Sequence, residues 1–202
     1  MSAVAMSVRP LRADAQRNRE KLLAAATRAF ADEGEDVALE TVAVRAGVGI
    51  GTLYRHFPNR DALVVAAYQH EVDQLCAAAE QLLGAQPADQ ALRAWAERFA
   101  DYVATKRSMG EALRTAVSSS DAPVFAETRD RIIRALRLLL DAGAADGSLR
   151  VDVSCEDIMR IVNACWYVPD GPDWRNAVGR MLDLVIDGLR YGAADRSRLP
   201  AR

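Results

Sequence analysis

Residues 39–62 read LETVAVRAGVGIGTLYRHFPNRDA, and this stretch decides the fold. Two short helical segments, 39–46 and a second one ending at Phe57, flank a tight turn at Val48-Gly49. Pro58 stops the second segment because proline cannot continue a helix. Two short helices around a glycine turn are the smallest unit that can place one helix in a major groove. The stretch therefore predicts a helix-turn-helix.

The second helix of this pair has an apolar side and a polar side. Leu53 and Phe57 are expected to face Val42 and Ala43 across the turn. The side left outward consists of Ile50, Gly51, Thr52, Tyr54, Arg55 and His56. Hydroxyl and imidazole groups suit phosphate oxygens, an arginine can reach a base edge or a phosphate, and glycines allow close backbone approach. The alternative interpretation is a helical hairpin with an incidental polar face.

Helical periodicity continues through nearly all of the 202 residues, and no segment alternates long enough to be a strand. We expect a helix from an Asp14 cap to Ala31 with Gly34 just past its end, and a long one from Arg60, capped by Asn59, into the low 80s. Further helices are predicted around 92–102 and 111–116, from an Asp121-Pro123 start to glycines 143 and 147, from a Ser154/Asp157 capping box through Cys165, and over 174–189. The segment 84–87 is the best linker candidate. The predicted fold class is all-α.

Composition and charge narrow the class of protein. Half of the residues are hydrophobic and 27% are charged, which is ordinary for a folded soluble chain. The net charge is -2, yet residues 1–31 carry six basic side chains against two acidic ones. A compact basic patch can bind phosphate on an acidic protein, because screening confines its field to roughly 10 Å.

The cysteines and histidines give no sign of a metal or cofactor, and none is expected. Cys76, Cys155 and Cys165 lack paired spacing and are interpreted as thiols in a reducing cytoplasm. His56 and His70 cannot form a histidine-rich centre by themselves. No stretch approaches the ~18–20 apolar residues of a membrane span, so a cytosolic location is predicted.

The helix-turn-helix resembles the DNA-binding domain of TetR-family transcriptional regulators. The resemblance is carried by Ala46-Gly47-Val48, by Thr52-Leu53-Tyr54-Arg55-His56-Phe57, and by Pro58-Asn59-Arg60-Asp61-Ala62-Leu63. The preceding residues 16–26, with Phe30 and Gly34, match the family's first helix, and the match covers about residues 10–70. It implies an N-terminal arm over 1–11, a DNA-binding domain over 12–72, and a helical ligand-binding and dimerisation domain over 73–202.

The resemblance also implies roles for individual residues. Thr52, Tyr54, His56 and Arg60 fall on positions that contact the DNA backbone, and Ile50, Gly51 and Arg55 on positions that tune sequence preference. Arg45 and Gly49 complete the expected DNA-binding set. The sequence departs from the family at Ala38, where a serine or threonine cap is usual, and at Gly49, where serine is frequent.

In the second domain the resemblance implies helices around a small-molecule cavity for an apolar or aromatic effector. The candidate lining residues are Trp95, Phe99, Tyr102, Met109, Leu113, Phe125, Asn163, Trp166 and Tyr167. The alternative is that the aromatic residues are plain core. A second alternative makes Cys165 a redox sensor.

The last helix carries two adjacent apolar rows, one of Trp174, Val178, Met181 and Val185 and one of Leu182, Ile186 and Leu189. A helix packed only on its own chain needs one stripe, so two rows predict one face against the chain's own core and one against a partner. Which row faces outward stays open. The predicted homodimer interface is Ile158, Val162, Val178, Met181, Leu182, Val185, Ile186 and Leu189.

Together these features predict a homodimeric repressor that binds a palindromic operator and is released by a small molecule. The competing class is an all-α enzyme or ligand-binding protein with a vestigial helix-turn-helix. An enzyme would need a nucleophile–base pair or a metal constellation, and neither is present in the sequence pattern.

Overall fold

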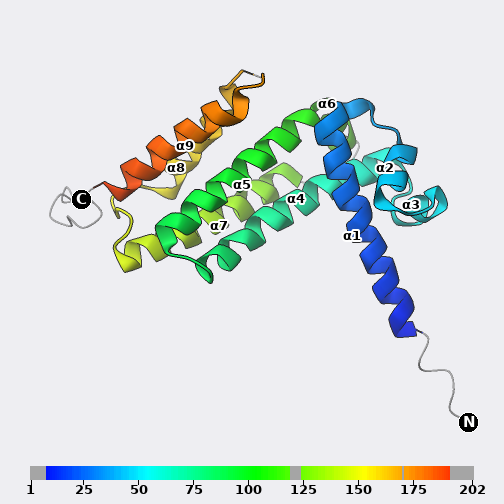
Figure 1. Cartoon of the computed structure of the whole chain (residues 1–202), viewed down its shortest axis with the longest axis horizontal. Coiled ribbons are helices and arrows are strands. Elements are labelled where there is room, and N and C mark those ends of the chain that lie inside the picture. The colour runs from blue at the N-terminus through cyan, green and yellow to red at the C-terminus, as the bar shows by residue number, and fades with distance from the viewer. Residues whose placement is uncertain (1–7, 119–123, 170, 192–202) are drawn as a thin grey trace, which may run out of the picture. The chain divides into compact units, whose positions relative to one another are not determined.

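The computed structural model describes residues 8–118, 124–169 and 171–191, and within these ranges every regular element is a helix (Figure 1). The all-α prediction is therefore confirmed. The chain forms two compact units. Unit 1 holds the described residues of Met1–Glu71 and Ala104–Ala122, and unit 2 holds those of Val72–Val103 and Pro123–Arg202. None of the helices in the described ranges has the length and apolar character needed to cross a bilayer.

Unit 1 contains the predicted helix-turn-helix. Its elements are α1 (Val8–Glu33), the 3-10 turn η1 (Gly34–Asp36), α2 (Leu39–Ala46), α3 (Ile50–His56), the first part of α4 (Arg60–Leu83), the end of α5 (Ala88–Ser108) and α6 (Gly110–Ser118). Helix α1 packs against both α2 and α3. The bounds of α2, α3 and α4 agree with the predicted segments, and the Asn59 side chain caps α4 by accepting from the Ala62 amide at 2.8 Å.

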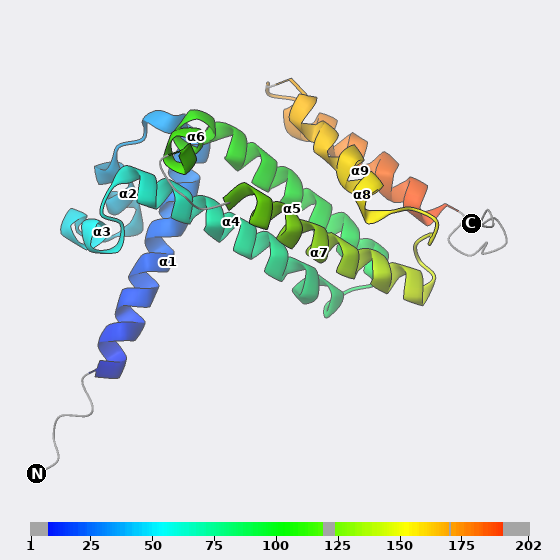
Figure 2. The ribbon, with the colours of Figure 1, turned by 180° about the vertical axis from the view of Figure 1, so that it is seen from behind.

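The start of α1 differs from the prediction. The helix begins at Val8 rather than at Asp14, and its first turns continue away from α2 and α3 (Figure 2). Asp14 lies inside the helix and pairs with Arg17 one turn further on. The carboxylate therefore makes an i,i+3 ion pair within α1, where the sequence pattern suggested a cap. Gly34 stands just past the helix end with a φ of 74°, as expected for a left-handed terminus.

Unit 2 is built from the second part of α4, most of α5, α7 (Val124–Asp146), α8 (Cys155–Val162), the 3-10 turn η2 (Asn163–Tyr167) and α9 (Trp174–Arg190). Helix α9 runs antiparallel to α5 (Figure 1). Three arginine–aspartate pairs follow this register: Arg175 with Asp101, Arg93 with Asp183, and Arg190 with Asp89. Each pair has at least one exposed partner, so each contributes little stability and mainly records the alignment.

Helices α7 and α8 of unit 2 end at residues other than those the sequence pattern predicts. The Ser154 hydroxyl accepts from the Asp157 amide at 3.0 Å, so the predicted cap of α8 is confirmed. That helix ends at Val162, however, and Cys165 lies in η2. Gly143 does not end α7, which continues to Asp146, and Gly147 with a φ of 79° follows it. The start signals at Asp121 and Pro123 lie outside the described residues.

Candidate nucleic-acid interface

The α2–α3 pair is held together by a buried apolar contact and a glycine turn. Val42, Ala43, Leu53 and Phe57 are all at most 2% exposed, as the sequence predicts. Gly47 ends α2 in the left-handed region at a φ of 68°, a conformation that favours glycine. Its amide donates to the Val44 carbonyl at 3.0 Å. The direction of α3 is thus set by contacts on its inner side.

The outer side of α3 is open to solvent. Tyr54 is 47% exposed and Ile50 38% exposed, Arg55 and Gly51 are exposed, and Thr52 and His56 are half-buried. A Cβ added at Gly49 or Gly51 would meet nothing within 4 Å. The structure therefore presents the predicted donors on one side of a short helix whose backbone another molecule can approach.

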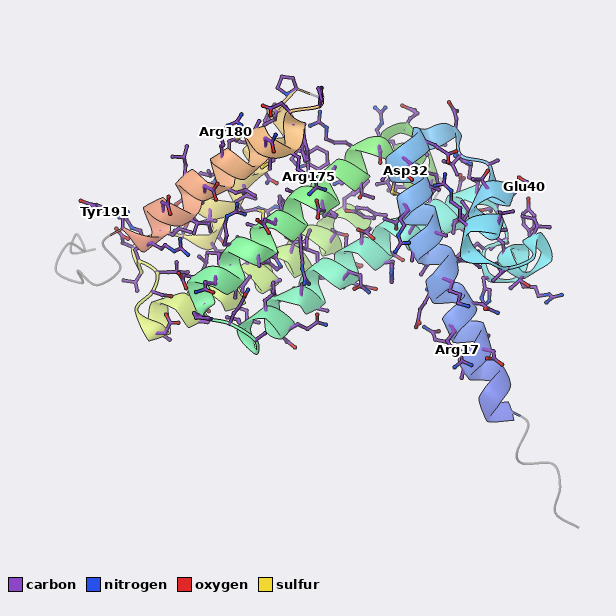
Figure 3. The ribbon with its side chains drawn as sticks, viewed as in Figure 1. Arg17, Asp32, Glu40, Arg175, Arg180 and Tyr191 are labelled. Atoms are coloured by element: carbon purple, nitrogen blue, oxygen red, sulfur yellow. The ribbon has the colours of Figure 1, made fainter. Side chains whose placement is uncertain are left out.

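Two arginines of the predicted DNA-binding set are engaged inside unit 1. Arg45 on α2 pairs with Glu33 and, at 3.2 Å, with Asp32, which Figure 3 labels near the end of α1. Arg60 donates to the Val37 carbonyl, and its guanidinium lies 5.6 Å from the centre of the Phe30 ring. Both side chains thus connect helices within the unit, which the sequence pattern did not reveal.

Two of the basic residues of α1 border a depression whose charge is mixed. Lys21 and Arg28 are exposed on α1, and together with Arg45 they border an open depression of about 570 Å³. Asp32 also lines this depression, so its charge is mixed.

Three of the predicted effector residues form one aromatic cluster on α5. The Trp95 and Phe99 ring centres lie 5.8 Å apart, and those of Phe99 and Tyr102 5.7 Å apart. All three are at most 5% exposed, and the Trp95 indole N–H donates to the Leu75 carbonyl at 2.9 Å. This packing is also what the plain-core interpretation expects.

The other predicted effector residues are spread over both units. Met109 and Leu113 are buried in unit 1. In unit 2, Phe125 is 39% exposed, Trp166 is half-buried, Asn163 is exposed and Tyr167 is 87% exposed. Asn163 and Tyr167 face solvent, whereas the α5 rings lie inside the unit.

The apolar residues of α8 and α9 differ in exposure, and the two predicted rows of α9 do not separate into one buried and one open row. Six residues of the predicted dimer interface are at most 4% exposed in the single chain: Ile158, Val162, Val178, Leu182, Ile186 and Leu189. Met181, Val185 and Trp174 are half-buried. Leu184 is 75% exposed and Ile161 on α8 is 49% exposed. The predicted set omitted Leu184, although its place three residues after Met181 was a readable signal.

The thiols have the properties of buried groups. Cys155 and Cys165 are buried and Cys76 is half-buried, and burial raises the pKa of each above its ordinary value of 9.0. A redox sensor needs an accessible thiol of lowered pKa, so this setting speaks against that role for Cys165. Across the described ranges, no group of three or more His, Cys, Asp or Glu side chains is placed to hold a metal ion.

Comparison with known proteins places the chain in a family. Residues 22–67 match the family model of bacterial regulatory proteins of the tetR family, and residues 86–191 match the C-terminal domain of SbtR-like transcriptional regulators. The HTH-type transcriptional repressor KstR2 of Mycolicibacterium smegmatis is 29% identical over 193 residues, which cover 88% of this chain and 93% of that protein.

Solved structures of TetR regulators are also similar to this chain. A TetR transcriptional regulator from Streptomyces coelicolor is 46% identical with a TM-score of 0.80, and the match covers 85% of this chain and 98% of that one. A TetR regulator from Mycobacterium vanbaalenii is 32% identical with a TM-score of 0.71, covering 90% and 99%. All of these relatives are named as transcriptional regulators. The chain belongs to the TetR family of bacterial transcriptional regulators.

Proposed function

We propose that this protein is a homodimeric repressor that binds operator DNA through α3 and leaves it when a small molecule binds unit 2. The observation that carries the proposal is the outer side of α3. Tyr54, Arg55 and Ile50 are exposed there. Leu53 and Phe57 are buried and hold α3 against the rest of unit 1. In a chain of this family, such a face is suited to enter a major groove.

The polar groups of α3 divide by what they can recognise. The hydroxyls of Thr52 and Tyr54 and the His56 ring suit phosphate oxygens, which orient a protein on the duplex without reading sequence. Arg55 can make a bidentate contact with a guanine, and Ile50 can contact a thymine methyl group. The open space around Gly49 and Gly51 lets the backbone of α3 come close to DNA.

The direction of regulation is inferred from relatives. KstR2 and KstR of Mycolicibacterium smegmatis, 29% and 30% identical to this chain, are both named as repressors. A repressor in a bacterium acts where the operator is, so we expect the protein in the cytoplasm.

The proposed dimer uses the apolar side chains of α9 that their own chain leaves wholly or partly exposed. Leu184 is exposed, and Met181 and Val185 beside it are only half-covered by their own chain. Ile161 adds an exposed apolar side chain on α8. Burying these side chains against a second copy removes apolar surface from water. This burial stabilises the dimer by about 25 cal/mol per Å². A two-fold axis would then present two copies of α3 to half-sites about 34–36 Å apart.

The proposed effector is a small apolar or aromatic molecule, and the aromatic cluster of α5 supports this class. Such a ligand can regulate only through a difference in its affinity for the DNA-binding and DNA-free conformations. Because Trp95, Phe99 and Tyr102 already contact one another, the ligand would have to displace part of this packing.

The test is binding to duplex DNA from upstream of the protein's own gene, measured by fluorescence anisotropy against an unrelated duplex. We expect preferential binding that weakens steeply with salt, because phosphate contacts release counterions. Arg55→Ala, at the side chain that can reach a base, should reduce the preference, whereas Gln69→Ala, at an exposed position of α4, should keep it. Equal binding to both duplexes at every salt concentration would contradict the proposal.

A further inference from the structure

Arg60 connects the start of α4 to the start of α2. It is the first residue of α4 and is half-buried, and its guanidinium donates to the carbonyl of Val37. The same group lies over the Phe30 ring at 5.6 Å. Phe30 is fully buried and Val37 is 2% exposed, so both partners belong to the interior of unit 1.

The carbonyl to which Arg60 donates lies at the start of α2, where no side chain caps the helix. Val37 directly precedes Ala38, the N-cap of α2, which has no side chain able to accept a hydrogen bond from the first turn. The first backbone bond of α2, from the Val42 amide to the Ala38 carbonyl, is long at 3.3 Å. A hydrogen bond to the Val37 carbonyl fixes the peptide plane that joins Val37 to Ala38.

The geometry needs an arginine and not merely a positive charge. A planar guanidinium can stack on an aromatic ring with its face while its edge donates to a carbonyl. The ammonium of a lysine is a point charge on a flexible stem and cannot do both in one fixed orientation.

The start of α2 bears on DNA recognition because α2 leads directly into α3 through the Gly47 turn. A second arginine supports the other end of the pair, since the Arg19 guanidinium lies 5.3 Å from the centre of the Phe57 ring. We propose that Arg60 is a positioning residue for the recognition helix, acting through Val37 and Phe30, and that it does not serve as a phosphate ligand. This inference rests on the DNA binding proposed above.

The experiment compares the full-length protein with Arg60→Gln and Arg60→Lys on two duplexes, one from upstream of its own gene and one unrelated. In both variants we expect upstream-DNA affinity to fall roughly tenfold, the factor that about 1.4 kcal/mol represents. Affinity for the unrelated duplex and the slope of affinity against salt should stay as in the unaltered protein. Arg60→Lys keeps the positive charge. A loss of affinity for the upstream duplex in this variant would therefore show that charge alone is not what Arg60 contributes.

If Arg60 were a phosphate ligand, the two variants would give different DNA-binding results. Arg60→Lys would then bind normally, and Arg60→Gln would weaken both duplexes equally and lower the salt slope by about 0.9. That pattern, or upstream-DNA binding unchanged in both variants, overturns the proposal.

Amide hydrogen exchange without DNA separates this inference from the proposed function. The Val42 amide should exchange faster in both variants, while the Leu113 amide of α6, bonded at 2.8 Å to the carbonyl of Met109, the residue before this helix, should not change. Unchanged exchange at Val42 overturns the proposal even if DNA binding is specific. If the unaltered protein does not distinguish the two duplexes, DNA recognition fails while the exchange result still decides the role of Arg60. Should Arg60→Gln fail to fold, Arg60→Lys gives the same readings.

Discussion

The side chain of Leu149 occupies the space that a side chain at Gly143 would need. A Cβ at Gly143 would lie 2.3 Å from Cδ1 and 2.5 Å from Cγ of Leu149. The Leu149 amide donates to the Gly143 carbonyl at 2.9 Å, and Leu149 is 1% exposed. The chain after α7 thus folds back over the last turns of this helix. Glycine is needed at 143 because Leu149 packs directly against it. From the sequence alone, its place near the end of α7 predicts that Gly143 terminates the helix.

Gly143→Ala should therefore lower the free energy of unfolding by about 1–3 kcal/mol, the usual cost of overpacking. Gly179→Ala in α9 is the matched control, because a Cβ there meets nothing within 4 Å. Alanine should raise helix stability at that position by up to about 1 kcal/mol. Denaturant unfolding of both variants measures the difference, and equal stability of the two would contradict the packing account.

Gly51→Ala should separate DNA binding from folding. A Cβ at Gly51 meets nothing within 4 Å in the DNA-free protein, and alanine favours the helix by roughly 1 kcal/mol. Thermal stability should stay the same or rise. Affinity for the upstream duplex should fall, because the added methyl group keeps the α3 backbone away from DNA. An unchanged affinity would show that DNA does not approach α3 at this residue.

Leu184→Glu should give a folded monomer. Leu184 is 75% exposed in the single chain, so the charge disturbs only a contact with a second copy. Ile186→Glu, at a position 2% exposed, should instead unfold unit 2. Sedimentation velocity and circular dichroism distinguish these results. Leu138→Glu makes the same change at a leucine of α7 that is 40% exposed and should remain dimeric. A dimeric Leu184→Glu protein would exclude this face of α9.

Trp95→Ala should destabilise the protein by about 3–5 kcal/mol, the range for deleting a buried aromatic side chain. Trp166→Ala should cost less because Trp166 is half-buried in η2. Differential scanning calorimetry measures both. If Trp95→Ala melts like the unaltered protein and only loses the release of DNA by aromatic compounds, the α5 cluster lines an accessible cavity and is not core.

The three thiols should react slowly with iodoacetamide at neutral pH. Burial raises the pKa of each, so the reactive thiolate is scarce below the ordinary value of 9.0. Cys76 is half-buried and should be labelled first, whereas Cys155 and Cys165 should react only after unfolding in denaturant. Mass spectrometry of the labelled peptides gives the order. Rapid labelling of Cys165 in the native protein would restore the redox-sensor interpretation.

Local signals in the sequence determined most of the fold. The glycine turn between α2 and α3, the stop at Pro58, the Asn59 cap and the Ser154/Asp157 capping box each act over a few residues, so they can be read without knowing the partners. The apolar spacing of α2 and α3 likewise predicted which side is buried, because both helices pack on each other across one short turn. The family resemblance and the outward side of α3 follow from the same stretch.

Only the tertiary structure showed the direction of side chains whose partners lie far away in the sequence. Arg60 meets Phe30 and Val37, which lie far back in the chain, so its inward direction could not be read from its place at the start of α4. Periodicity showed two apolar rows on α9, but only packing within unit 2 revealed that Leu182 and Ile186 are buried while Met181 and Val185 are only half-buried. The spacing of residues along one helix specifies its faces. Which face is buried depends on the neighbouring helices, and the spacing within one helix carries no information about them.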